Sequence, residues 1–114
     1  MSKLFTDKTV KAVYDMLRKL PPFDKWNLPV PSKIIFEVNE EPDILGEFDV
    51  EPLVIRLSTA HQETFENLLK TTAHEMVHLK LYIEGKSNYD KHDKTFRKYM
   101  TQINALFGYD KKEL

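Results

Sequence analysis

The sequence predicts an α+β fold with an N-terminal helix, a small and mostly antiparallel three-stranded sheet, a central helix and a C-terminal helix. Three observations support this prediction. Apolar residues recur with a helical period over residues 7–20, 60–84 and 93–106. Three short runs rich in β-branched and aromatic residues lie between the first two of these segments. The chain has 114 residues, enough for one hydrophobic core, so we expect residues 1–114 to form a single domain.

The first predicted helix spans residues 7–20. Either Thr6 or Asp7 can cap its N-terminus, and Pro21 and Pro22 end it because proline cannot continue a helix. Its apolar stripe consists of Val10, Val13, Tyr14, Leu17 and Leu20. We expect this stripe to pack in the core.

Residues 21–32 are expected to form an extended connector because this segment contains four prolines. Its aromatic residues Phe23 and Trp26 are expected to fold back onto the core. Three strands are predicted after it, at residues 33–38, 44–50 and 53–57. Because Pro52 cannot donate a ladder hydrogen bond, the strand after it is expected at the sheet edge. An exposed edge there could accept an extended peptide as an added strand, unless the connector covers it.

Two further helices follow the predicted strands. The central helix is expected at residues 60–84, with Thr59 and Gln62 at the spacing of a capping box. Its apolar face consists of Phe65, Leu68, Leu69, Thr72, Met76, Leu79 and Ile83. The last helix is expected at residues 93–106, with Gly108 as its stop signal. Its apolar face consists of Phe96, Tyr99, Met100, Ile103 and Phe107.

The composition excludes several classes of protein. The chain contains no cysteine, which excludes a disulfide framework, a cysteine-ligated zinc module and a thiolate nucleophile. Any metal must therefore be held by His, Asp or Glu. No apolar run is long enough to cross a membrane or to act as a secretory signal. We expect a cytoplasmic monomer with no membrane partner.

The formal net charge of -1 conceals a basic-acidic-basic pattern along the chain. Residues 1–36 carry seven basic and three acidic side chains, residues 37–66 carry one and nine, and residues 86–112 carry seven and three. One interpretation is a mixed-charge surface that faces water. The other is that the basic segments meet in space and face an anionic partner such as single-stranded DNA.

The central helix contains the sequence His74-Glu75-Met76-Val77-His78, an H-E-x-x-H pattern. Four residues make slightly more than one helical turn, so both imidazoles can reach one metal ion at about 2.0–2.1 Å. Glu75 is rotated from them by about 100°, which suits a general base better than a ligand. A chance match, with both histidines simply exposed, is the alternative interpretation.

A catalytic zinc site needs three protein ligands and one open position. Glu84 lies about 9 Å beyond His78 along the helix, and His61 lies roughly 20 Å before His74, so neither can reach the same ion. His92 follows a seven-residue loop and can return beside His78. We therefore expect His74, His78 and His92 to bind Zn²⁺, with Asp90 and Asp93 as alternatives to His92.

The segment from His74 onward resembles the catalytic signature of SprT-like and Spartan-type metallopeptidases. In that signature H-E-x-x-H is followed by H-G-x-x-F and a helix with a Met and an Ile-Asn pair. The matching positions are His74, Glu75, His78, His92, Phe96, Met100, Ile103 and Asn104, and residues 55–58 resemble the preceding strand. The similarity covers about residues 53–109, with Asp93 where the family commonly has glycine. Asp93 can still cap the last helix.

This resemblance implies a minimal zincin-like fold and zinc-dependent peptide hydrolysis, with Glu75 as the general base. Family members act in DNA–protein crosslink repair, although the cysteine-bearing zinc module by which many hold DNA is absent from these residues. The alternatives are a catalytically silent module that binds DNA or a protein partner, and a single-metal nuclease. The step of fourteen positions from His78 to His92 argues against the nuclease, because three-histidine nucleases place the third histidine only a few residues beyond the second. Glu75 favours the enzyme, because a silent scaffold has no chemical need for it.

Two further groups of residues are candidates for roles at the site. The tyrosines Tyr82, Tyr89, Tyr99 and Tyr109 could donate to a developing oxyanion, although each also suits a core or surface aromatic. Lys91, Lys94, Arg97 and Lys98 surround the start of the last predicted helix. They would place positive charge beside His92, where a single-stranded DNA could bind.

Overall fold

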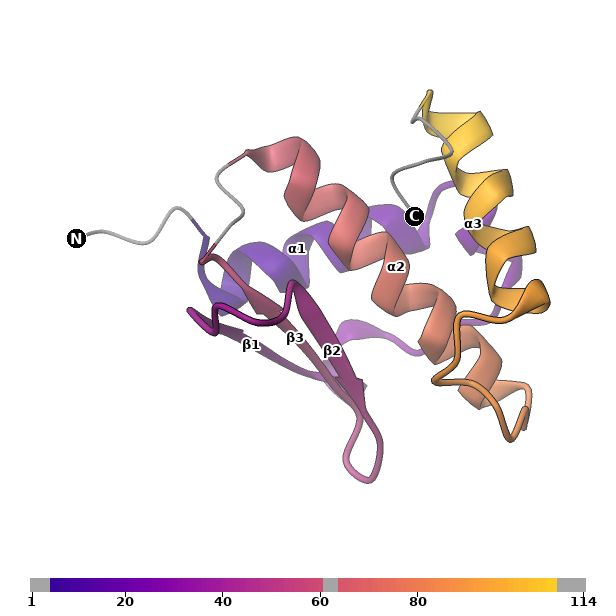
Figure 1. Ribbon diagram of the computed structural model, residues 1–114, viewed down its shortest axis with the longest axis horizontal. Coiled ribbons are helices and arrows are strands. Elements are labelled where there is room, and N and C mark those ends of the chain that lie inside the picture. The colour runs from indigo at the N-terminus through magenta and orange to yellow at the C-terminus, as the bar shows by residue number, and fades with distance from the viewer. Residues whose placement is uncertain (1–4, 61–63, 109–114) are drawn as a thin grey trace.

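The computed structural model describes residues 5–60 and 64–108 and confirms the predicted α+β class (Figure 1). Its elements, in chain order, are α1 (Asp7–Arg18), the short 3-10 helices η1 (Phe23–Lys25) and η2 (Pro31–Lys33), β1 (Ile35–Asn39), β2 (Gly46–Asp49), β3 (Val54–Ser58), α2 (Phe65–Ile83) and α3 (Lys94–Phe107). Among the described residues, no helix is long and apolar enough to cross a membrane.

Helix α1 begins with a capping box in which Thr6 Oγ1 accepts from the Thr9 backbone N–H. The helix ends at Arg18, two residues before the predicted end. Leu20 therefore lies outside the helix and is 40% exposed, so its predicted place in the core is wrong. The other four members of the predicted stripe are buried.

The sheet has the strand order β1-β3-β2. β3 pairs parallel with β1 and antiparallel with β2, so the sheet is mixed rather than mostly antiparallel. β3 is consequently the central strand, and the predicted edge position of residues 53–57 is wrong. Pro52 lies in the turn that joins β2 to β3, where its missing N–H costs no ladder hydrogen bond. The free edge beside α2 belongs to β2 (Figure 1).

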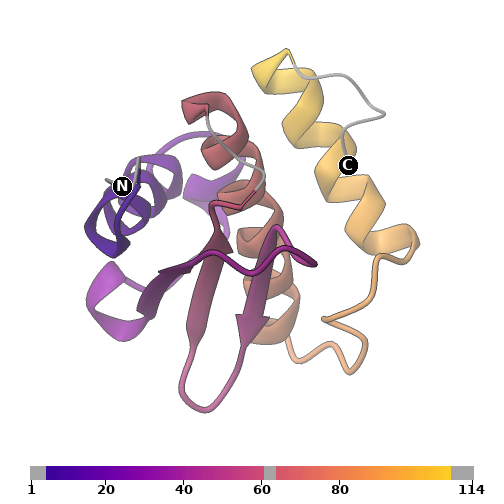
Figure 2. The same cartoon turned by 60° about the vertical axis from the view of Figure 1, so that its left-hand side comes forward.

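Helices α1 and α2 cover one face of the sheet (Figure 2). Ile55 and Leu57 of β3 point into this interface and are fully buried. On the opposite face, Arg56 bonds Glu37 of β1 at 2.8 Å and Glu47 of β2 at 3.2 Å. Arg56 is the one residue of β3 that is not buried, and its ion pairs place charge on the face of the sheet opposite the core.

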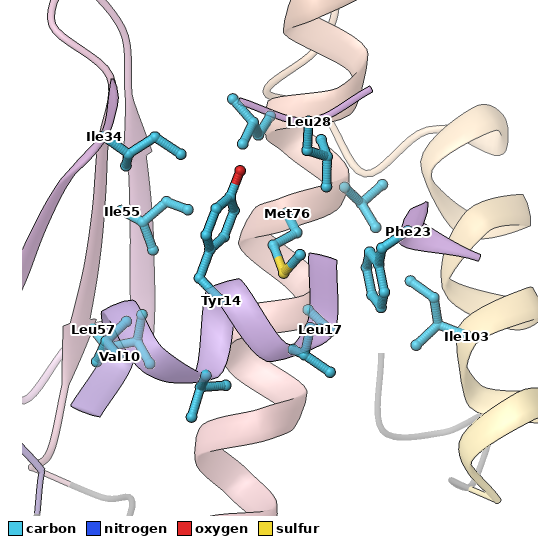
Figure 3. Close-up of a cluster of buried hydrophobic side chains, with 14 of the residues drawn as sticks. Val10, Tyr14, Leu17, Phe23, Leu28, Ile34, Ile55, Leu57, Met76 and Ile103 are labelled. Carbon is cyan, nitrogen blue, oxygen red and sulfur yellow. The ribbon is translucent and has the colours of Figure 1, made fainter. Parts of the chain in front are cut away.

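The core lies between the sheet, α1 and α2 (Figure 3). Tyr14 of α1 lies in it, and its hydroxyl donates to the Pro29 carbonyl at 2.7 Å. This bond holds the connector against the core. Phe23 and Trp26 are buried, which confirms that the connector folds back. Phe23 packs toward Phe107 of α3, with ring centroids 6.2 Å apart.

Helix α2 starts later than the sequence predicts. Its N-cap is Thr64, whose side chain accepts from the Asn67 N–H at 3.1 Å, so the predicted cap at Thr59 is wrong. Gln62 and His61 lie outside the described residues. The middle of the predicted apolar face is buried, but Phe65 and Ile83 at its two ends are exposed.

Helix α3 begins and ends close to the predicted residues. Asp93 is its N-cap and accepts from the Phe96 N–H at 3.0 Å. Gly108 ends the helix in the left-handed conformation, with φ at 75°, where a side chain would be strained. Phe96, Met100 and Ile103 face the core, and the orange segment before α3 turns back toward α2 (Figure 1).

Candidate metal centre

Three histidine side chains from two segments converge on one point. His74 and His78 lie one turn apart on α2, and His92 lies in the loop just before α3. The Nε2 atom of His92 lies 3.1 Å from Nε2 of His74 and 3.3 Å from Nε2 of His78. One nitrogen from each side chain lies within 4.8 Å of the others. The loop between the helices therefore brings His92 beside the helical pair.

The two distances from His92 are close to those between ligands of a tetrahedral metal ion. In such a site, two nitrogen ligands that are each about 2.0–2.1 Å from zinc lie about 3.3–3.4 Å apart. The observed separations of 3.1 and 3.3 Å are close to that spacing. Imidazole nitrogen is a ligand that zinc prefers, and three such ligands leave one position open for a water or substrate atom.

A hydrogen bond at Nδ1 fixes the orientation of the His78 ring. Nδ1 of His78 lies 2.7 Å from the Tyr89 carbonyl oxygen, where it can donate a hydrogen bond. This bond leaves Nε2 with the free lone pair that a metal needs. Tyr89 packs against Phe48 and Tyr82, so side chains of β2, α2 and the loop support its position.

Phe96 forms the apolar base of the cluster. Its ring centroid lies 4.8 Å from that of His74, 4.5 Å from His78 and 4.6 Å from His92. Because Phe96 is buried at the start of α3, it limits how far the three imidazoles can move.

The two helical histidines are held in the neutral form, which is the form that binds metal. Burial, with smaller contributions from His78 and His92, lowers the pKa of His74 to about 3. Burial also lowers the pKa of His78, and the Tyr89 carbonyl partly opposes this effect. Both side chains are therefore neutral near pH 7.

Glu75 lies next to the histidines and faces β2. Its side chain is buried, which, together with the charge of Glu47, raises its pKa to about 8. A Cβ atom built on Gly46 would lie 3.0 Å from Oε2 of Glu75 and 2.9 Å from Cγ2 of Thr71. The absence of a side chain at Gly46 thus allows β2 to approach α2 at Glu75.

Gly46 is a site residue that the sequence reasoning did not identify. In the sequence it is a glycine within the strand predicted at residues 44–50, where it is interpreted as a turn former. A glycine inside a strand can instead mark close approach of a neighbouring element, but this signal has many other causes.

The other candidate ligands have different surroundings. Asp93 caps α3 and also accepts from the Asn88 side-chain amide. Glu84 pairs with Lys80 at 3.1 Å, and Asp90 is exposed on the loop. Within residues 5–60 and 64–108, the cluster of converging metal-binding groups comprises His74, His78 and His92.

Two cavities flank the histidines along β2. One, of about 350 Å³, is lined by Ile44, Leu45, Gly46, Lys70, Thr71, His74, Glu75, His92 and Met100. The other, of about 220 Å³, is lined by Gly46, Glu47, Phe48, Asp49, His74, Glu75, His78, Asp90 and His92. Because they share four residues, they form one cleft that passes the histidines. A larger cavity, of about 500 Å³, lies by the start of α1 and contains none of these four residues.

The described tyrosines considered as oxyanion donors do not line this cleft, and the basic side chains are exposed at the start of α3. Tyr82 and Tyr89 pack against Phe48, whereas Tyr99 packs against Trp26. None of these three tyrosines lines either cavity, and Tyr109 lies outside the described residues. The side chains of Lys91, Lys94, Arg97 and Lys98 are exposed around the start of α3.

Comparison with known proteins adds a family assignment. The sequence model of the SprT-like family matches residues 32–113, which is more than half of the chain and includes the three histidines. Searches of curated proteins and of solved structures find no match. On the strength of the family match, this chain belongs to the SprT-like family.

Proposed function

We propose that this protein is a zinc metallopeptidase that hydrolyses internal peptide bonds. His74, His78 and His92 hold Zn²⁺, and Glu75 is the general base. The convergence of the three histidines, with Nε2 of His92 at 3.1 and 3.3 Å from the Nε2 atoms of His74 and His78, beside a buried Glu75 in the same cleft, carries this proposal. Family membership supports it.

The side chains divide the chemistry among them. Bound zinc supplies a Lewis acid that polarises the substrate carbonyl and lowers the pKa of a water ligand. In its ionised form, which the positive charge of bound zinc would favour, Glu75 accepts a proton from the attacking water and returns it to the leaving amine. The absence of a side chain at Gly46 lets the backbone of β2 lie close to the Glu75 carboxyl group.

The substrate binds as an extended segment along β2. β2 is an edge strand, and both cavities beside the histidines lie along it. An added strand is bound through its backbone, so folded proteins are poor substrates and flexible or unfolded segments are good ones. Proteins attached to DNA are a suitable substrate class, because Lys91, Lys94, Arg97 and Lys98 place positive charge beside His92.

A proteolysis assay tests the proposed function. The zinc-loaded protein is incubated with an unfolded protein, with and without a metal chelator, and the products are identified by mass spectrometry. We expect cleavage that the chelator abolishes and that added zinc restores. No cleavage by fully loaded protein, with or without single-stranded DNA, would reject the proposal.

The main alternative is a metal-bound module without peptidase activity that binds DNA or a protein partner. The exposed basic side chains at the start of α3 favour it. The burial of Glu75 beside the histidines is unexplained by that alternative, because an ionisable side chain is costly to bury without a role. Zinc binding with DNA affinity but no cleavage would be its signature.

A further inference from the structure

The two ends of the cleft differ in chemistry. Besides the residues that the two cavities share, the larger one is lined by Ile44, Leu45, Lys70, Thr71 and Met100, whereas the lining of the smaller one includes Glu47, Asp49 and Asp90. We propose that the larger cavity is a specificity pocket that binds a large apolar side chain next to the scissile bond. This inference rests on the proposed peptidase function and specifies its substrates.

The cavity opens directly beside the proposed catalytic groups. Gly46, His74, Glu75 and His92 form part of its wall, so a side chain inside it belongs to a residue adjacent to the reacting carbonyl. Its volume of about 350 Å³ is at the lower end of the range for ligand pockets, about 300–1,000 Å³, which suits one large side chain. Lys70 on its wall lies 3.5 Å from Glu66, so its charge has a partner outside the pocket.

The rim of the pocket is held in place by β3. The Ser58 N–H donates to the Leu45 carbonyl at 2.9 Å, and its hydroxyl donates to the Glu41 carbonyl at 2.6 Å. Ser58 is itself buried at the end of the central strand. The segment that carries Ile44 and Leu45 is therefore attached at two points, and the pocket is formed before a substrate arrives.

The strand direction predicts which substrate residue enters the pocket. Antiparallel pairing is slightly more stable than parallel pairing, so we expect the peptide to run antiparallel to β2. Its residues after the scissile bond then lie opposite Ile44 and Leu45, and its residues before the bond lie opposite residues 47–49. The large apolar side chain is consequently expected on the C-terminal side of the cleaved bond.

Cleavage-site profiling of a peptide library tests this inference. We expect Leu, Met or Phe after the scissile bond, and at least about a tenfold lower kcat/KM when Ala replaces it. Ile44→Asp should remove this preference by placing a charge at the mouth of the pocket. Ile35→Asp is the matched control, because Ile35 is equally apolar but lies 47% exposed on β1, at the other edge of the sheet. Leu45→Asp, at a 52% exposed position, provides a second variant that should fold.

A binding measurement separates this inference from the proposed function. Two peptide hydroxamates that differ only in an isobutyl or a methyl side chain beside the chelating group are titrated into zinc-loaded protein by calorimetry. We expect the isobutyl compound to bind at least about tenfold more tightly to wild type and to the Ile35→Asp variant, but not to Ile44→Asp. If wild type binds the isobutyl and methyl compounds with equal affinity, the proposed specificity pocket is rejected, even if peptides are cleaved. A difference in binding without any cleavage would uphold the pocket and reject the peptidase.

Discussion

Gly46 on β2 faces Glu75 on α2 so closely that a Cβ atom at Gly46 would lie 3.0 Å from Oε2 of Glu75. The edge strand and the buried carboxylate thus form two walls of the same cleft. A peptide that pairs with β2 would therefore lie beside Glu75. The close approach of Gly46 to Glu75 thus brings the proposed binding edge next to the proposed base.

Gly46→Ala should lower both activity and stability. The added methyl would overlap Glu75 and Thr71, and overpacking of this kind costs about 1–3 kcal/mol. We expect thermal unfolding to shift down by several degrees, peptide hydrolysis to fall, and zinc content to stay unchanged. Asp43→Ala, an exposed change three residues away, is the control. Full activity in Gly46→Ala would show that this contact does not matter for catalysis.

His92→Ala should remove most of the zinc. It deletes one of three converging ligands, and two histidines one turn apart bind zinc much more weakly. Elemental analysis should show near-stoichiometric zinc in wild type and a sharp loss in the variant. Asp93→Ala should keep its zinc and lose about 1 kcal/mol of stability, because Asp93 caps α3. The reverse pattern of zinc loss would move the third ligand from His92 to Asp93.

Glu75→Gln should abolish peptide hydrolysis without loss of zinc. The amide fills the same space but cannot accept the proton, and general-base catalysis contributes about 10²–10⁴-fold to a rate. Turnover and zinc content should be measured on the same preparation. A variant that retains substantial activity would exclude Glu75 as the base.

Single-stranded DNA should bind through the exposed basic residues near His92. Replacing Lys91, Lys94 and Lys98 by Ala should weaken binding in gel-shift or anisotropy assays and reduce its salt dependence, because each phosphate contact in a single strand contributes a slope of about 0.7. Lys8→Ala with Lys11→Ala, on the exposed side of α1, is the control. If no binding occurs at low salt, DNA is not a partner of this segment.

The sequence could predict the helices and the meeting of the three histidines because both depend on local spacing. The repeat of apolar residues identifies α3 almost to the residue, and a short loop must return His92 to His78. Leu20 was placed wrongly because its apolar character continues the stripe beyond the point where the helix ends.

The sheet order and the Gly46 contact depend on tertiary structure. Alternation of apolar residues shows that residues 54–58 have a core face, but it does not show which strands lie on either side of them. Pro52 was a misleading signal, since it lies in a turn and not in the ladder. The close approach at Gly46 depends on how β2 packs on α2, and no short-range pattern encodes that distance.

We expect β2 to hold a substrate through backbone hydrogen bonds. In a bound strand, successive backbone amides point alternately toward β2 and away from it, so only every second N–H of the peptide can donate to the edge. We therefore expect N-methylation of a model substrate, scanned one amide at a time, to reduce kcat/KM with a period of two. Each sensitive position should lose roughly 10-fold, consistent with about 1.4 kcal/mol for a lost hydrogen bond and added bulk. The same assay with folded and unfolded forms of one protein should show cleavage of the unfolded form alone. Sensitivity at every position, or equal cleavage of both forms, would rule out strand addition at β2.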